Sequence, residues 1–126
     1  MESQTESKEV SKIIYWQESD TKQKIVDALK KNYVLITTTD TIPGFCANIT
    51  ELGFDRLNKI KGGRQAKPYI ILISDLSKIE HFVDLASLNL KVQDLLKKCW
   101  PGPLTVIFKA RKDLPYFLKS AQDTVA

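Results

Sequence analysis

The sequence predicts an α/β fold in which helices cover a sheet. Helical patterns alternate with short apolar runs along the chain, which is typical of this class. The 126 residues amount to one domain, and an apolar content of 43% with 27% charged residues is ordinary for one compact core. No internal repeat is visible. We therefore expect one globular α/β unit.

The amino-terminal part contains a predicted tail, a helix and a strand. Residues 1–12 are polar and aperiodic, which predicts a disordered tail before a domain at 13–126. Asp20 or Thr21 can cap a helix that ends near residues 30–32. Its apolar face would contain Ile25, Val26 and Leu29. The run YVLITT that follows, at 33–38, has the composition of a buried strand.

The second helix should begin at Thr50 and end at Gly62 and Gly63, with Phe54, Leu57 and Ile60 on one face. The run YIILI at 69–73 predicts another strand.

Beyond this strand, Ser74 or Asp75 can cap a short helical piece, and residues 88–99 show the period of a longer helix. The sequence PGP stops that helix. An apolar strand at 104–108 and a basic loop, KARKD, follow.

Composition restricts the possible functions. No apolar run approaches the roughly 18 residues of a membrane span, and the amino terminus has no apolar signal segment, so we expect a cytoplasmic protein with no membrane partner. Cys46 and Cys99 lack the spacing of a metal site, and we expect buried thiols instead of a disulfide. The formal net charge of +4 is compatible with anionic partners but does not identify one.

The sequence pattern lacks the usual catalytic constellations. His81 has no Cys or carboxylate neighbours at ligand spacing, and we expect it to lie on the surface. No Ser-His-Asp or Cys-His arrangement is visible, so no residue is assigned as a nucleophile, general base or metal ligand.

The loop TTTDTIPG, from Thr37 to Gly44, is the first candidate site. It places hydroxyl groups and one carboxylate after a predicted strand, where α/β folds gather ligands. These groups could bind the amine and hydroxyl of a small polar substrate. Alternatively, they satisfy the backbone of their own turn.

The segment KIKGGRQAKP, from Lys59 to Pro68, is the second candidate. Its four cations have the charge that phosphates and carboxylates require, and two glycines would let a ligand approach the backbone. The spacing of a Walker loop is absent. The alternative is a helix carboxyl cap flanked by solvated lysines.

The segment WPGPLT, from Trp100 to Thr105, is the third. Two prolines around a glycine predict a rigid turn, and Trp100 would be an apolar plug whose N–H needs a partner.

Taken in order, the three segments resemble the YrdC-like family, which makes L-threonylcarbamoyladenylate for the N6-threonylcarbamoyladenosine (t6A) modification of tRNA. That family reads approximately P-T-D-T-x-Y-G-L where this chain has TTDTIPGF, residues 38–45. Its I-K-x-R with a following Lys-Pro resembles Ile60, Lys61, Arg64, Lys67 and Pro68, and its W-P-G-P-x-T matches residues 100–105. The resemblance runs from about Ile13 to the end of the chain.

The resemblance implies a twisted, open mixed sheet flanked by helices. It also implies a reaction in which L-threonine captures bicarbonate or CO2 as a carbamate, which attacks ATP and releases pyrophosphate. By the same resemblance, Thr39 and Thr41 would bind threonine. Mg2+ would accompany ATP through its phosphates and water. The anionic groups of the substrates would be bound by Lys61, Arg64, Lys67 and Thr105.

Three departures from the family pattern affect these expectations. Pro43 replaces an aromatic residue, and the spacing K-G-G-R replaces K-x-R, so Arg64 could point differently. The chain ends at DTVA, where family members continue to a Ser-x-Asn motif that helps to bind the nucleotide. We therefore expect a YrdC-like domain that lacks its carboxyl-terminal part.

Two other functions are compatible with the sequence. The first is a module of the same fold that binds double-stranded RNA, tRNA or a nucleotide without catalysis. The second is a shortened relative with a structural role. An enzyme would work with downstream t6A-modification proteins, and an open sheet edge could be covered in a homodimer.

Overall fold

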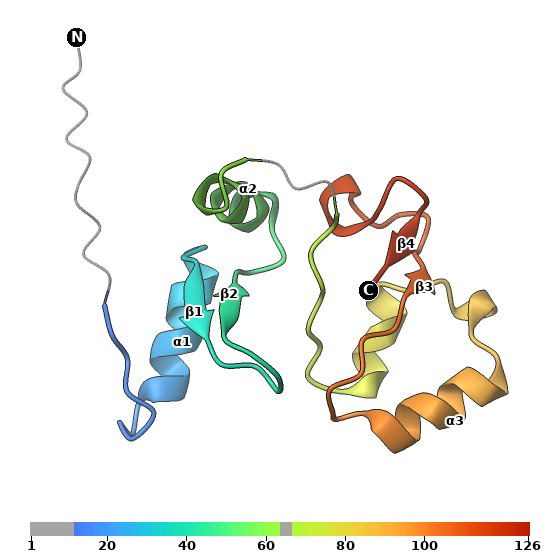
Figure 1. The fold of residues 1–126 in the computed structure, drawn as a ribbon, viewed down its shortest axis with the longest axis horizontal. Helices are drawn as coiled ribbons and strands as arrows, with labels where there is room; N and C mark the ends of the chain where they lie inside the picture. Colours follow the sequence, from blue (N-terminus) through green and yellow to red (C-terminus); the bar gives the residue numbers. More distant parts are fainter. Residues whose placement is uncertain (1–11, 64–66) are drawn as a thin grey trace, which may run out of the picture.

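The computed structural model describes residues 12–63 and 67–126, arranged in two lobes (Figure 1). The first lobe contains helix α1 (Thr21–Lys30), strands β1 (Leu35–Thr37) and β2 (Gly44–Cys46), and helix α2 (Glu51–Ile60). The second contains helix α3 (Leu90–Cys99), strands β3 (Phe108–Lys109) and β4 (Thr124–Val125), and the 3-10 helices η1 (Leu76–His81), η2 (Leu85–Ser87) and η3 (Tyr116–Leu118). No helix in the described ranges is long and apolar enough to cross a membrane.

In the first lobe, β1 and β2 form an antiparallel hairpin. Leu35 pairs with Cys46 and Thr37 pairs with Gly44, so residues 38–43 form the connecting loop. The strand predicted at 33–38 is confirmed at its centre, whereas β2 was not predicted. Helix α1 begins after Asp20, as expected, although the Asp20 side chain makes no capping hydrogen bond. The hairpin therefore fixes the first candidate loop at one end of the lobe.

Helix α2 begins at a side-chain cap. The Thr50 hydroxyl oxygen accepts the Gly53 N–H at 3.0 Å, which satisfies one of the free amides of the first turn. Gly53 is buried, and a Cβ there would lie 2.4 Å from the backbone oxygen of Asn48. Glycine is thus required where the preceding turn meets the helix. Leu57 and Asn58 are buried on the same helix, which positions its carboxyl end.

The apolar core lies in the second lobe. Leu96 of α3 is 1% exposed and packs in a cluster with Ile79, Val83, Ala110, Leu114 and Val125. The antiparallel pair β3–β4 and a bridge between Val83 and Ala110 tie this cluster to the backbone. Asn89 caps the start of helix α3, because its side chain accepts the Val92 N–H at 2.9 Å. The helix predicted at 88–99 is thus confirmed with a later start.

Two predicted strands differ in the structure. No strand is assigned at 69–73, and of the run 104–108 only Phe108 belongs to β3. Alternation survives at 69–73, since Ile71 and Ile73 pack on the core while Ile70 and Leu72 are 59% and 66% exposed. Apolar alternation is therefore present, but a strand also needs a neighbouring backbone to pair with. In this run the Ile71 N–H donates to the backbone oxygen of Ala126 at 2.9 Å, without a continuing ladder.

The amino-terminal cap of η1 predicts an acid-sensitive contact. A hydrogen bond from the Ser77 hydroxyl, helped by the Ser77 N–H at 2.9 Å, holds the pKa of Asp75 below its ordinary value. Because the folded-state pKa is lowered, the contact stabilises the fold above the unfolded-state pKa of about 3.9. The contribution is lost as the pH falls through the folded-state pKa.

A 13C titration of the side-chain carboxyls should therefore show Asp75 titrating below the ordinary aspartate value of about 3.9. In Ser77→Ala, which removes the hydroxyl donor, the midpoint should move up toward about 3.9. A midpoint at or above about 3.9 in the unchanged chain would contradict the assignment of this cap.

Candidate functional site

The loop after β1 uses one of its hydroxyls within its own turn. The Thr39 Oγ accepts the N–H groups of Thr41 and Ile42 at 3.2 Å and donates to the backbone oxygen of Ile42 at 2.6 Å. The alternative that this hydroxyl satisfies its own turn is therefore observed. The Thr41 Oγ lies 3.3 Å from the Thr39 Oγ and is exposed, as is Asp40. Thr41 consequently offers more free hydrogen-bonding capacity to a ligand than Thr39.

The paired glycines cap the carboxyl end of α2. The Gly62 N–H donates to Lys59 at 3.3 Å and the Gly63 N–H donates to Asn58 at 2.8 Å, which is the hydrogen-bond pattern of a Schellman motif. Gly62 has a φ of 86° and Gly63 a φ of 129°, a region that favours glycine. The expected helix cap is thus present. It also fixes the backbone from which Lys61 projects.

The cations of this segment are exposed. Lys59, Lys61 and Lys67 all lie at the surface, and Arg64 lies outside the described residues. Lys61 Nζ is 5.4 Å from the ring centroid of Tyr69. Among the described residues, no carboxylate forms an ion pair with Lys61 or Lys67. Their charges therefore remain available to an anion, which must also overcome the negative end of the α2 dipole.

The WPGPLT segment is a structural corner. Trp100 Nε1 donates to the backbone oxygen of Leu104 at 2.8 Å, and the ring packs edge-on against Phe108 with centroids 6.4 Å apart. The predicted apolar plug with a satisfied N–H is confirmed. A Cβ at Gly102 would lie 2.4 Å from the backbone oxygen of Cys99, so this tight turn requires glycine. Thr105 is exposed beside the corner.

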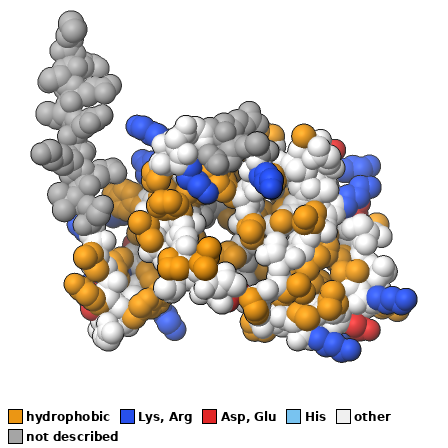
Figure 2. Space-filling view, in the orientation of Figure 1, with side chains coloured by type: hydrophobic (Ala, Val, Ile, Leu, Met, Phe, Trp, Pro, Cys, Tyr) orange, Lys and Arg blue, Asp and Glu red, His pale blue; other side chains and the backbone are white. Residues whose placement is uncertain are grey.

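The structure does not bring the first two candidate segments together. Figure 1 shows the loop between β1 and β2 at one end of the first lobe and the carboxyl end of α2 at the other. The hydroxyls of Thr39 and Thr41 bond within their own loop, whereas Lys61 lies against Tyr69. In Figure 2, Lys and Arg side chains near α2 are separate from those at the edge of the second lobe, and hydrophobic side chains cover much of the face between them.

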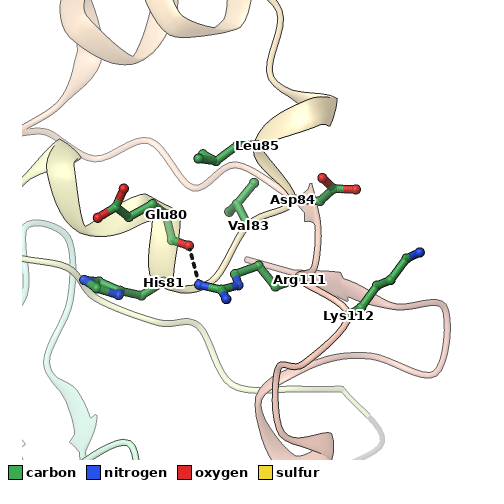
Figure 3. A pocket seen from close by; sticks show the side chains of 7 residues that line it. All are labelled: Glu80, His81, Val83, Asp84, Leu85, Arg111 and Lys112. Atoms are coloured by element: carbon green, nitrogen blue, oxygen red, sulfur yellow. Dashed lines mark hydrogen bonds between the residues drawn. The ribbon is translucent and has the colours of Figure 1, made fainter.

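A shallow groove in the second lobe was not predicted from the sequence. Figure 3 shows its lining, which consists of Glu80, His81, Val83, Asp84, Leu85, Arg111 and Lys112. Arg111 Nη1 donates to the backbone oxygen of Glu80 at 3.0 Å, and its other nitrogens pair with Asp113 at 2.9 Å. Asp84 lies 3.8 Å from Lys109 Nζ. Because Arg111 is already paired with Asp113 and the carboxylates of Glu80 and Asp84 add negative charge to the lining, this groove is a weaker anion site than the end of α2.

His81 is exposed, as expected, and packs edge-on against Phe82. Both cysteines are free, as expected, but they are only partly buried. Burial raises the pKa of the Cys46 thiol, so the thiolate is disfavoured. Within the described residues there is no group of three or more His, Cys, Asp and Glu side chains that could hold a metal ion.

Known proteins are similar in sequence to most of this chain. The sequence profile of the Sua5/YciO/YrdC family, described as "Telomere recombination", matches residues 27–126. The threonylcarbamoyl-AMP synthase of Klebsiella pneumoniae is 28% identical over 102 residues, covering 80% of this chain and 54% of that protein. The enzyme of the same name from Vibrio vulnificus is 29% identical over 105 residues, covering 82% and 56%. The chain thus spans about half the length of the curated relatives it matches.

A solved structure shows the same fold. Sua5 of P. abyssi, complexed with L-threonine, superimposes with a TM-score of 0.76 and 25% sequence identity, covering 86% of this chain and 32% of that chain. The expected YrdC-like α/β architecture is confirmed by this similarity. The described residues contribute mixed helices and two small antiparallel sheets to it.

Proposed function

Since the chain belongs to the Sua5/YciO/YrdC family, we propose that it carries part of a threonylcarbamoyl-AMP synthase site. Its substrates would be L-threonine, bicarbonate or CO2, and ATP. The observation that carries this proposal is the profile match over residues 27–126, supported by relatives that are named threonylcarbamoyl-AMP synthase. The complex of P. abyssi Sua5 with L-threonine supports threonine as a substrate.

The proposed reaction needs charge stabilisation more than a protein nucleophile. The threonine amine and bicarbonate form a carbamate with loss of water, and one carbamate oxygen then bonds to the α-phosphorus of ATP. The bond from that phosphorus to the oxygen that bridges to the β-phosphorus breaks, which releases pyrophosphate. Every reactant is an anion or becomes one, so fixed cations and hydrogen-bond donors lower the barrier. We assign the anionic groups to Lys61, Arg64 and Lys67, with Thr105 as a further contact. Thr41, and less directly Thr39, would contact threonine.

Mg2+ would enter with ATP as part of the substrate. The described residues offer no cluster of acidic, His or Cys ligands for a resident metal, which fits an ion held by phosphate oxygens and water. Downstream t6A-modification proteins would use the product to modify a tRNA.

The direct test is product formation. The purified chain at high concentration is incubated with L-threonine, bicarbonate, ATP and Mg2+, and threonylcarbamoyl-AMP is measured by mass spectrometry. We expect product that disappears when L-threonine is omitted. ATP hydrolysis without threonine dependence would contradict the proposal. A chain that fails to bind either L-threonine or ATP would also contradict it. RNA binding with a steep salt dependence but no product would favour the non-catalytic module.

The role of Lys61 can be tested separately by ATP binding. An exposed charge pair at about 4 Å contributes roughly 1 kcal/mol, so Lys61→Ala should weaken ATP binding about fivefold in equilibrium dialysis. Folding should change little because the side chain is exposed. Lys98→Ala is the matched control, because Lys98 is also an exposed lysine at the carboxyl end of a helix. An equal loss in both variants would show a general charge effect, not a site.

A further inference from the structure

Lys61 is held beside an aromatic ring that follows the glycine cap. Its Nζ lies 5.4 Å from the ring centroid of Tyr69, within the range of a cation–π interaction. Lys61 is the carboxyl cap of α2, and Tyr69 belongs to the extended segment that leads into the second lobe. The contact therefore links the two sides of the connection between the lobes.

The ring itself is fixed from two directions. The Tyr69 hydroxyl donates to Asn58 Oδ1 at 2.7 Å, and Asn58 is 8% exposed. Phe54 meets the ring edge-on with centroids 5.9 Å apart. Burial raises the pKa of the Tyr69 phenol, so the hydroxyl keeps its proton and remains a donor. Both Asn58 and Phe54 lie on α2, so the helix that carries Lys61 also sets the position of the ring.

Asn58 connects this arrangement to the glycine cap. Its side-chain oxygen accepts a hydrogen bond from the Tyr69 hydroxyl, and its backbone oxygen accepts one from the Gly63 N–H at 2.8 Å. The turn that follows Lys61 and the ring that faces it are thus anchored on one buried residue. A lysine side chain loses rotamer entropy when it is ordered, so holding it in advance lowers the cost of ordering it on a ligand.

We propose that Tyr69 is a positioning residue that holds the Lys61 ammonium ready for a phosphate group of the substrates. The proposal rests on the proposed function of Lys61 as an anion-binding residue. Lys61 has no carboxylate partner among the described residues, so the ring orients the charge without neutralising it. An acidic partner at this position would orient the lysine equally well but would compete with the ligand.

Tyr69 also has a structural role that the test must separate. Phe54 contacts Tyr116 and Phe117 as well as Tyr69, so this aromatic group joins α2 to the second lobe. Tyr69→Leu could therefore loosen the fold. Tyr69→Phe keeps the ring and the aromatic contacts and removes only the hydroxyl bond to Asn58.

The test is a double-mutant cycle read by ATP and pyrophosphate affinity, using Lys61→Ala, Tyr69→Leu and the variant with both changes. With Lys61 present, Tyr69→Leu should weaken binding about two- to fivefold, the range expected for an exposed cation–π contact. In the Lys61→Ala background the same change should have almost no effect. Tyr69→Phe should bind within about twofold of the unchanged chain.

NMR gives a second readout that a purely structural role would not move. A ring current from Tyr69 should shift the ε-methylene protons of Lys61 upfield, and the shift should persist in Tyr69→Phe and vanish in Tyr69→Leu. Equal losses of affinity for Tyr69→Leu in both backgrounds, or no ring-current shift in the unchanged chain, would overturn the inference while leaving the anion-binding role of Lys61 intact. If Lys61→Ala binds ATP and pyrophosphate normally, the assignment of Lys61 fails and the inference fails with it.

Discussion

Leu96→Ala is expected to lower the free energy of unfolding by about 2–5 kcal/mol. Leu96 is 1% exposed and lies in the core cluster of the second lobe, together with Ile79 of η1 and Val125 of β4. The substitution removes apolar burial and leaves a cavity that the surrounding β3–β4 pair and η1 can fill only in part. Because small domains have only about 5–15 kcal/mol of total stability, this one change should remove a large share of it.

Urea denaturation followed by circular dichroism measures the loss. The matched control is Leu95→Ala, on the same helix one residue earlier, where the side chain is 46% exposed. We expect that control to cost less than half as much, because less apolar surface returns to water. Similar losses at both positions would mean that α3 does not pack on the core through Leu96.

The helices could be predicted from the sequence because their signals are local. Thr50 caps α2 and Asp75 caps η1 through side-chain bonds within three residues, and the glycines that end α2 are read directly from the chain. Asn89 begins α3 for the same reason, although the sequence pattern placed that start slightly too early. Helix ends that are set by residues nearby in the sequence can thus be predicted well.

The strands depend on partners that a local pattern cannot identify. The run at 69–73 has the right alternation, but Ile71 is the residue whose N–H reaches another backbone, at Ala126. In contrast, β2 has little strand signal of its own and forms because β1 lies beside it in the hairpin. Pairing across the chain decides both outcomes.

Around Lys61, the helix cap could be predicted from the sequence, whereas the aromatic contact could not. The sequence identified Lys61 and the paired glycines, and the structure shows that the glycines form a helix cap. The role of Tyr69 was missed, because its contact with Lys61 depends on how the segment after the cap folds back onto α2. The sequence does show a tyrosine directly after the Lys-Pro pair, but its position alone does not indicate a contact with Lys61.

The 126-residue chain, assayed alone, should release pyrophosphate in a threonine-dependent way at least about 100-fold more slowly than the roughly 1 per second of an ordinary enzyme. The exposure of the proposed site residues is the first reason. Thr41, Lys61 and Thr105 are exposed, so water screens their charges and hydrogen bonds. The loop between β1 and β2 and the carboxyl end of α2 also lie at opposite ends of the first lobe, so they do not hold two reactants in line (Figure 1).

The measurement is pyrophosphate release with L-threonine, bicarbonate, ATP and Mg2+, together with the oligomeric state by light scattering. The oligomeric state matters because Ile36, Leu72 and Ile107 are 76%, 66% and 70% exposed, and a second copy covering such side chains could also enclose the site. A slow rate should therefore rise with chain concentration if a homodimer forms. Turnover of about 1 per second from a monodisperse monomer would contradict this prediction. Such a rate would mean that the exposed groups catalyse the reaction without being enclosed.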